Sequence, residues 1–237
     1  MLPIHVKMEK RKVGSIPLIH LYPKGGSHSK MVYYHGWDSS AESSIFRGGI
    51  FASYGFDTYL PDALYHGERK DSKVLNTEED IDWKKLMDIV QTNKEEFGQI
   101  LDFIQGGRVY VSGHSMGALT VGLLVRDYPV LGGLAFNGSF DFQALADFYK
   151  VEEKLQGIDF PMDDLGAYKN KLLYLANGGQ DESIPAHQQE GFYKTLLKAG
   201  VDSCHFSLFE DVGHVVTTNM MDDGLRYLFS QDPELQK

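Results

Sequence analysis

The run Val109–Leu119 constrains the fold of this chain more than any other segment of its 237 residues. A short apolar, β-rich stretch leads into the sequence GHSMG at residues 113–117, and a helix-forming stretch follows. A Gly-x-Ser-x-Gly motif between a strand and a helix puts its serine on a tight turn, with the hydroxyl clear of the sheet. The two glycines let the strand and the helix approach closely. The context therefore predicts Ser115 as a nucleophile for acyl transfer, with a turn serine before a helix as the alternative.

A serine nucleophile needs a base, and the base needs an orienting carboxylate. His214 fits the base, because it follows a predicted strand and a turn that contains a glycine. Asp181 fits the acid, because it lies on a turn at the carboxyl end of the preceding predicted strand, where ligand sites gather in parallel sheets. The chain order Ser, Asp, His is that of one particular fold. The competing carboxylates are Glu182, Glu210 and Asp211.

Two backbone N–H groups are candidates for an oxyanion hole, which would stabilise the negative charge of the transition state. The first belongs to Met116, the residue after the nucleophile. The second belongs to Trp37, in a turn that Gly36 opens after a predicted strand ending at His35. A plain strand-ending turn is the alternative for this second loop.

Further residues are expected near the site without a part in the chemistry. His66 and Arg69 are expected to brace the oxyanion loop, with direct contact to substrate as the alternative. His114 is expected to pack beneath the nucleophile. The pocket candidates are aromatic and histidine side chains around these turns, some of them expected to be core: His35, Gly36, Trp37, Phe46, Tyr65, His66, His114, Phe140, Phe142, Phe148 and Tyr149. No helix carries the paired-histidine spacing of a zinc protease, so no catalytic metal is predicted.

Strand-like and helix-like segments alternate, which predicts one α/β domain over residues 1–237, with a mostly parallel sheet and helices on both faces. The predicted strands are Ile4–Glu9, Ile16–Tyr22, Lys30–His35, Asp57–Pro61, Arg108–Gly113, Gly133–Asn137, Leu172–Asn177 and Cys204–Phe209. The predicted helices are Ser43–Tyr54, Trp83–Gln105, Ser115–Asp127, Ala186–Ala199 and Asn219–Ser230. Residues 66–82 form a polar, charged link. Residues 138–170 are predicted to be a small lid, with a surface excursion containing a short helix, Phe142–Leu155, as the alternative.

The motifs in this order resemble the α/β-hydrolase superfamily: His35-Gly36 after a strand, GHSMG at 113–117, the turn at 178–185, and Gly213-His214. The sequence LPDALYHGER at residues 60–69 is similar to small bacterial esterases related to dienelactone hydrolases and to the catalytic domain of prolyl oligopeptidases. The resemblance implies an eight-stranded, mostly parallel sheet and a carboxylic ester hydrolase without a cofactor. Dienelactone hydrolases usually carry a cysteine nucleophile, whereas this chain has serine there, so their substrate is not implied.

Composition bounds the partners and the compartment. A net charge of -10 without a cluster of Lys and Arg argues against a nucleic-acid partner. No apolar run approaches the ~20 residues of a membrane-spanning helix. The amino terminus lacks a basic start followed by an apolar core, so a cytoplasmic protein is expected. The single cysteine, Cys204, agrees with a reducing compartment. The sequence leaves open whether the protein is a monomer or a homodimer.

The sequence thus predicts a serine carboxylesterase that acts on small, short-acyl esters, because the compact lid region favours small substrates. A peptidase of the prolyl oligopeptidase type, or a thioesterase, would use the same three side chains. A third alternative is a small-ligand-binding protein that keeps the fold without turnover. Such a protein would not require nucleophile, base, acid and oxyanion hole together.

Overall fold

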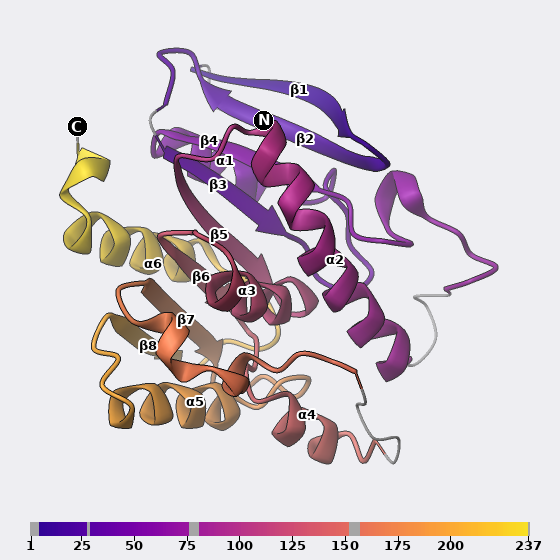
Figure 1. Ribbon diagram of the computed structural model, residues 1–237, viewed down its shortest axis with the longest axis vertical. Helices are drawn as coiled ribbons and strands as arrows, with labels where there is room; N and C mark the ends of the chain where they lie inside the picture. The colour runs from indigo at the N-terminus through magenta and orange to yellow at the C-terminus, as the bar shows by residue number, and fades with distance from the viewer. Residues whose placement is uncertain (1–4, 28, 76–80, 152–156, 237) are drawn as a thin grey trace.

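The computed structural model describes residues 5–27, 29–75, 81–151 and 157–236. One eight-stranded sheet runs through the molecule in the order β1-β2-β4-β3-β5-β6-β7-β8 (Figure 1). The strands are β1 Val6–Val13, β2 Ile16–Pro23, β3 Ser29–Tyr34, β4 Phe56–Pro61, β5 Arg108–His114, β6 Gly132–Phe136, β7 Leu172–Gly178 and β8 Cys204–Phe209. The pairings β1·β2 and β2·β4 are antiparallel, and the other five are parallel. The predicted mostly parallel, eight-stranded sheet is confirmed.

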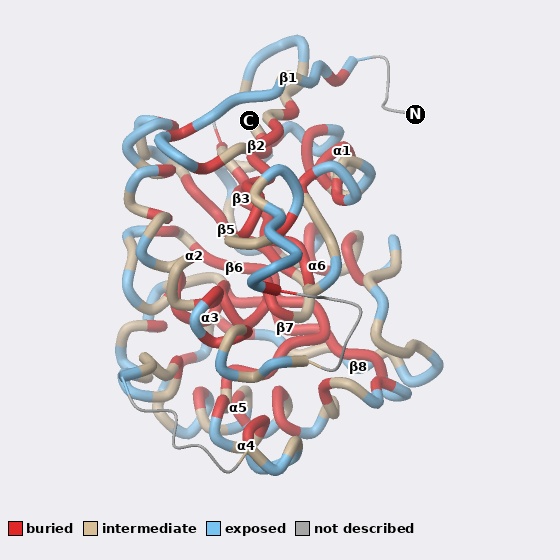
Figure 2. The backbone as a smooth tube through the Cα atoms, turned by 90° about the vertical axis from the view of Figure 1, so that its right-hand side faces the viewer, coloured by how far each residue is buried: buried red, intermediate tan, exposed pale blue. Residues whose placement is uncertain are grey.

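Helices cover both faces of this sheet. Their bounds are α1 Ile45–Ser53, α2 Trp83–Phe103, α3 Met116–Asp127, α4 Phe142–Phe148, α5 Ala186–Lys198 and α6 Thr218–Gln231. The core divides accordingly, because Val109 and Val111 of β5 pack with residues of α2, α3 and α5, whereas Tyr110 packs with residues of α1 and α6. Side chains of successive strand residues point to opposite faces. The central strands β3 to β7 therefore form the buried centre of the molecule (Figure 2).

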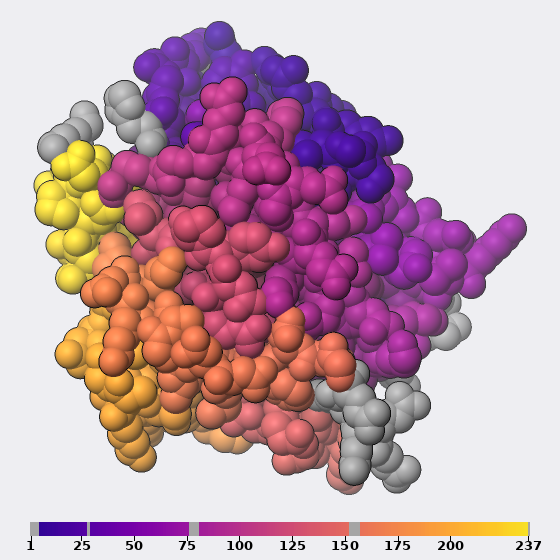
Figure 3. Space-filling view, in the orientation of Figure 1, coloured from indigo at the N-terminus to yellow at the C-terminus, as the bar shows by residue number. Residues whose placement is uncertain are grey.

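Helix α3 lies deepest, and its residues from Met116 to Val125 are all buried. A helix that is apolar on every side needs cover on every side. Part of that cover is the segment 157–171, whose short helical turns contact α3 and which forms part of the molecular surface (orange in Figure 3). The Tyr168 hydroxyl anchors this segment by donating to the Gly122 carbonyl of α3 at 2.8 Å. The segment is therefore bonded directly to the helix that follows Ser115.

Strand β1 is longer than predicted at its carboxyl end, since it continues to Val13 instead of ending at Glu9. Its central residues are charged and largely exposed, because β1 is an edge strand. A hairpin with β2 fixes its length, with Val13 opposite Ile16 and Gly14 at a φ of 56° in the turn. The predicted start at Ile4 lies outside the described residues.

Helix α4 is shorter than the predicted Phe142–Leu155, because it ends at Phe148. Lys150 adopts a left-handed φ of 55°, and the Val151 N–H donates to the Ala146 carbonyl at 2.9 Å. This pattern closes a helix at its carboxyl end. Residues 152–155 of the predicted helix lie outside the described part of the chain. Among the described residues, no helix combines the length and apolarity needed to cross a bilayer.

Candidate active site

Ser115 lies on the turn between β5 and α3, with backbone angles of φ 55° and ψ -119°. Two glycines permit this turn. A Cβ on Gly113 would lie 2.3 Å from backbone atoms of Gly117, and a Cβ on Gly117 would lie 2.0 Å from the Tyr34 carbonyl oxygen. Both distances are far below van der Waals contact, so only glycine lets β5, α3 and β3 come this close. The Ser115 N–H donates to the Phe136 carbonyl at 3.0 Å, which fixes the turn to β6.

The structure brings together the three side chains that the sequence reasoning selected. The Ser115 hydroxyl donates to Nε2 of His214 across 2.8 Å. The Nδ1–H group of the same imidazole donates to Oδ2 of Asp181 across 2.7 Å. These two bonds fix the tautomer that leaves Nε2 free to accept a proton. His214 follows β8 and Asp181 follows β7, so both approach Ser115 from the carboxyl edge of the sheet.

Asp181 is held in place by its own turn. Its Oδ1 accepts the N–H groups of Ser183 at 2.9 Å and Ile184 at 2.8 Å, which leaves Oδ2 directed at His214. The Asp181 side chain is fully buried, whereas the His214 side chain retains 26% exposure. A buried carboxylate needs several donors, and three converge here. Among the sequence candidates for the acid, Asp181 is therefore the carboxylate that the structure bonds to the imidazole of His214.

Gly36 lies directly against Ser115, and Trp37 lines the same cavity. A Cβ on Gly36 would lie 3.3 Å from the Ser115 Cβ and 3.2 Å from Nδ1 of His114, so a larger residue would crowd the serine. Met116 is the first residue of α3, where backbone N–H groups have no partner within the helix. The Met116 and Trp37 N–H groups remain our candidates for the oxyanion hole.

Polar side chains support the loop that carries Trp37. Nε2 of His35 accepts the Ala63 N–H at 3.1 Å, and its Nδ1–H donates to the Gly36 carbonyl at 2.8 Å. Asp62 accepts the Ala41 N–H at 2.8 Å from the same loop. Arg69, expected as a brace, donates to the Asp62 carbonyl at 3.2 Å and forms two 2.7 Å bonds to the Glu96 carboxylate of α2. These bonds link the loop to β4 and α2.

Burial keeps two histidines of the site neutral. Desolvation lowers the pKa of His35 from 6.5 to about 4, because a charge would lie in an apolar interior. Desolvation is the main cause that lowers the pKa of His114 to about 3, and the neighbouring His214 acts in the same direction. The rings of His114 and His214 are 4.9 Å apart between centroids. His114 therefore packs against the base as an uncharged ring.

We expect the free energy of unfolding to decrease as the pH falls from 6.5 toward 4, because the unfolded chain then binds a proton at His35 that the native state excludes. Above that window both states hold neutral imidazole, so the residue contributes no pH dependence. Each such histidine adds a slope of about 1.4 kcal/mol per pH unit within the window. Denaturant titration at several pH values measures this slope.

The control for this prediction is the exposed His187. His35→Gln should reduce the slope by about 1.4 kcal/mol per pH unit and leave the contribution of His114, whereas His187→Gln should leave the slope unchanged. Identical slopes in wild type and both variants would contradict the assignment of the pH dependence to buried His35.

A cavity of about 220 Å³ opens beside Ser115. Its lining is Gly36, Trp37, Ile81, Trp83, Leu86, His114, Ser115, Met116, Leu119, Tyr149, Ser183, Ile184 and His214. Seven pocket candidates from the sequence do not line it. Phe46 and Phe148 are exposed at the surface, and Phe142 is buried in the core. Phe140 is fully buried against Phe192 with ring centroids 5.1 Å apart. His35 and His66 lie behind the Trp37 loop. Tyr65 packs against a cluster of buried apolar side chains.

Several lining residues were missed by the sequence reasoning. Ile81 and Trp83 come from the end of the predicted polar link and the start of α2, and Leu86 follows on the same helix. The apolar pair around Asp82, inside an otherwise charged stretch, was the signal that could have found them. Tyr149, one of seven aromatic candidates, reaches the cavity from the end of α4 and donates from its hydroxyl to the Ser183 carbonyl at 2.6 Å.

No protein-family model matches the chain. Among curated proteins it is similar to "Putative esterase YitV" of Bacillus subtilis, at 27% identity over 219 residues that cover 81% of this chain and 84% of that protein. It is also similar to "Esterase YjfP" of Escherichia coli, at 23% identity over 244 residues that cover 94% of this chain and 98% of that protein.

Solved structures share the fold over nearly the whole chain. TT1662 from Thermus thermophilus matches with a TM-score of 0.74 and 21% identity, covering 96% of this chain and 98% of that one. An acylaminoacyl peptidase from Pyrococcus horikoshii matches with a TM-score of 0.63 and 17% identity, covering 95% of this chain and 40% of that one. The chain therefore has the α/β-hydrolase fold, as predicted, and its esterase relatives support hydrolase activity.

Proposed function

We propose that this chain is a serine esterase that hydrolyses small, short-acyl carboxylic esters through an acyl-enzyme intermediate. The observation that carries the proposal is the continuous hydrogen-bonded series from Ser115 through His214 to Asp181, at 2.8 and 2.7 Å. An ordinary serine hydroxyl is a weak nucleophile, and a base within hydrogen-bond distance activates it. The similarity to curated esterases supports ester hydrolysis as the reaction.

The reaction follows from these positions. The Ser115 oxygen bonds to the acyl carbon while His214 takes the hydroxyl proton, and the carbonyl electrons move onto the carbonyl oxygen. The Met116 and Trp37 N–H groups stabilise that oxyanion, each donor contributing about 3 kcal/mol in the transition state. His214 then gives its proton to the leaving alkoxide as the tetrahedral species collapses. Water, activated by the same imidazole, attacks the acyl-enzyme, releases the acid and restores the serine.

The cavity supports a small, uncharged acyl group. Its volume of about 220 Å³ lies below the range of about 300–1,000 Å³ that is usual for drug-sized ligands. Apolar side chains such as Leu86, Leu119 and Ile184 form much of its wall. Its lining contains no Lys, Arg, Asp or Glu side chain among the described residues, so a charged acyl group would lose its hydration without compensation.

The proposal is tested with p-nitrophenyl acetate, butyrate, octanoate and palmitate. We expect kcat/KM to be highest for the short esters and to fall by an order of magnitude or more with the long ones, because one methylene in a pocket is worth about 1–3 kcal/mol. Activity confined to the long chains would refute the short-acyl part. Faster cleavage of aminoacyl-naphthylamides than of any ester would favour a peptidase that uses the same three side chains.

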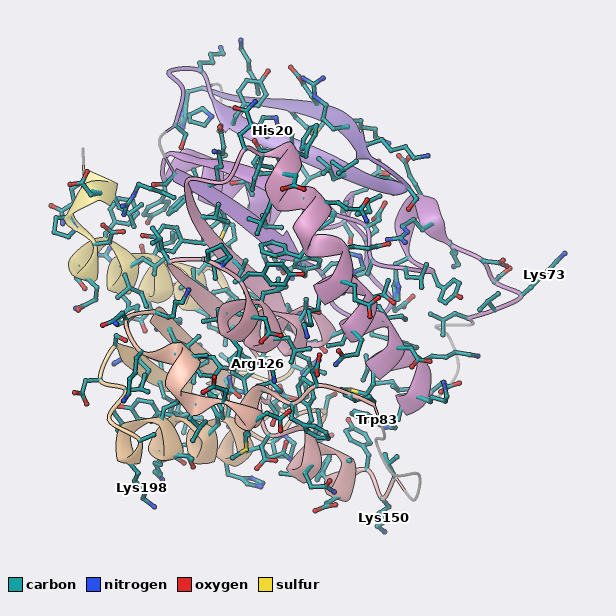
Figure 4. All side chains as sticks on the ribbon, in the orientation of Figure 1. His20, Lys73, Trp83, Arg126, Lys150 and Lys198 are labelled. Carbon is teal, nitrogen blue, oxygen red and sulfur yellow. The ribbon has the colours of Figure 1, made fainter. Side chains whose placement is uncertain are left out.

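Trp83 is expected to limit the length of the acyl group. Trp83 lies at the start of α2 (Figure 4). Its ring contacts that of Tyr149 with centroids 4.4 Å apart, and both residues line the cavity. Trp83→Ala should raise the octanoate-to-acetate ratio of kcat/KM about tenfold, because it opens room for further methylenes. Phe103→Ala, at the far end of the same helix and 43% exposed, is the matched control and should leave the ratio unchanged. An unchanged ratio in Trp83→Ala would show that another part of the cavity wall limits the length of the acyl group.

A further inference from the structure

Asn137 is a fully buried polar residue at the carboxyl end of β6, and the reaction described above does not use it. Its backbone adopts a left-handed φ of 50°. Both ends of its side-chain amide have partners. Oδ1 accepts the Gly178 N–H at 2.9 Å, and Nδ2 donates to the Val215 carbonyl at 2.8 Å. Because one partner is a donor and the other an acceptor, the orientation of the amide is fixed by chemistry.

These two partners belong to the two loops that carry the acid and the base. Gly178 ends β7 three residues before Asp181, and Val215 directly follows His214. The Asn137 N–H also donates to the Ala176 carbonyl of β7 at 2.8 Å. The preceding residue, Phe136, accepts the Ser115 N–H at 3.0 Å. The end of β6 is therefore bonded to the turns of all three proposed catalytic residues.

The His214 loop depends on such contacts because it is a surface turn. Within it, the Val215 N–H donates to the Gly213 carbonyl at 2.8 Å. The Gln180 N–H, in the loop that carries Asp181, donates to the Val212 carbonyl at 2.9 Å. Val212 precedes His214 in the same surface turn. The Asn137 amide holds the carbonyl just after the imidazole. The backbone is thus held both before and after His214. The Asn137 bond is the side-chain contact that ties this loop to the end of β6.

We propose that Asn137 is a positioning residue for the base: its amide sets the place of the His214 loop relative to β7, and so aligns the imidazole between Asp181 and Ser115. This inference rests on the proposed serine-hydrolase function. Asn137 does not line the cavity, so its role is separate from substrate binding. A misplacement of about 1 Å in a reacting group can cost on the order of a hundredfold in rate.

Two variants test this role. One removes the whole side chain without adding backbone strain, and the other keeps a side chain of the same size. Asn137→Gly removes both amide bonds, and glycine adopts the φ of 50° freely. Asn137→Asp keeps an acceptor for the Gly178 N–H but turns a carboxylate oxygen toward the Val215 carbonyl. The matched control is Asn177→Ala. Asn177 is equally buried at the end of β7, and its amide donates to the Gly138 carbonyl at 3.0 Å, outside the His214 loop.

The thermal unfolding midpoint is measured first for each variant. At a temperature below the lowest midpoint, we then measure kcat and KM for p-nitrophenyl acetate and the rate of Ser115 modification by a dialkyl fluorophosphate. We expect kcat and the modification rate to fall about 10- to 100-fold in both Asn137 variants, with KM within about twofold. Asn177→Ala should lose thermal stability but keep both rates within about threefold. The Asn177 side chain is buried but makes no bond to the His214 loop, so its loss should not displace the imidazole.

Modification of the Asn137 variants at the wild-type rate, or an equal loss of rate in Asn177→Ala, would overturn the positioning role. Should Asn137→Gly not fold, Asn137→Asp decides alone by the same criteria. Wild-type protein that does not react with the fluorophosphate would instead refute the proposed serine-hydrolase function, and the role of Asn137 with it.

Discussion

Ser115→Ala is expected to lower kcat for p-nitrophenyl acetate by a factor of about 10³ to 10⁶, with little change in thermal stability. The variant keeps the Cβ and the strained turn but removes the oxygen that must bond to the acyl carbon. Residual turnover would come from water held near the oxyanion donors. Steady-state hydrolysis of wild type and variant, purified in parallel, measures the loss.

The matched control for this substitution is Ser183→Ala, because Ser183 lines the same cavity and its hydroxyl has no place in the proposed reaction. We expect Ser183→Ala to keep kcat within about threefold of wild type. Equal rates in wild type and Ser115→Ala would contradict the assignment of the nucleophile. An equal loss in both variants would indicate general damage to the site.

Asp181→Asn is expected to lower kcat by about 10⁴-fold while the fold stays intact. The asparagine oxygen would keep the two backbone bonds from Ser183 and Ile184, because both are donors. Its NH₂ group would then face Nδ1 of His214 and donate to it. The imidazole would carry its proton on Nε2, toward Ser115, and could not accept the hydroxyl proton. The expected loss is therefore in kcat, with KM changed little.

Glu182→Gln is the control for Asp181→Asn, since Glu182 is the adjacent carboxylate and is exposed. It should retain wild-type kcat. If Glu182→Gln lost activity and Asp181→Asn did not, the acid would have been assigned to the wrong residue, and the turn after β7 would need a different orientation in solution.

Much of the fold was predictable because its signals are local. The central strands read as nearly continuous apolar runs, which is typical of strands covered on both faces. Ser115 and Asp181 each follow such a run at a turn, and His214 follows the edge strand β8, so their common edge of the sheet could be inferred from topology. The glycines at 113 and 117 carried the same information in steric form. For these elements, the residues that determine the local structure are also close together in the sequence.

The remainder depends on contacts between distant segments. Ile81 and Trp83 sit in a charged stretch, and only the packing of α2 against α3 and α4 brings them to the cavity. Phe140 comes soon after β6, yet its ring points into the core against Phe192. Asn137 and Asn177 look alike in sequence, as single asparagines at strand ends. Their difference is the partner of each amide, which no local pattern encodes.

Ser115 as the activated nucleophile is tested best by intact-protein and peptide mass spectrometry after treatment with a dialkyl fluorophosphate. We predict one adduct per chain, located on Ser115, formed in proportion to the loss of esterase activity, and absent from Ser115→Ala. The reagent requires an activated serine, and among the described residues only the bond from Ser115 to His214 supplies that activation. An unmodified protein, or an adduct on another residue together with lost activity, would contradict the account.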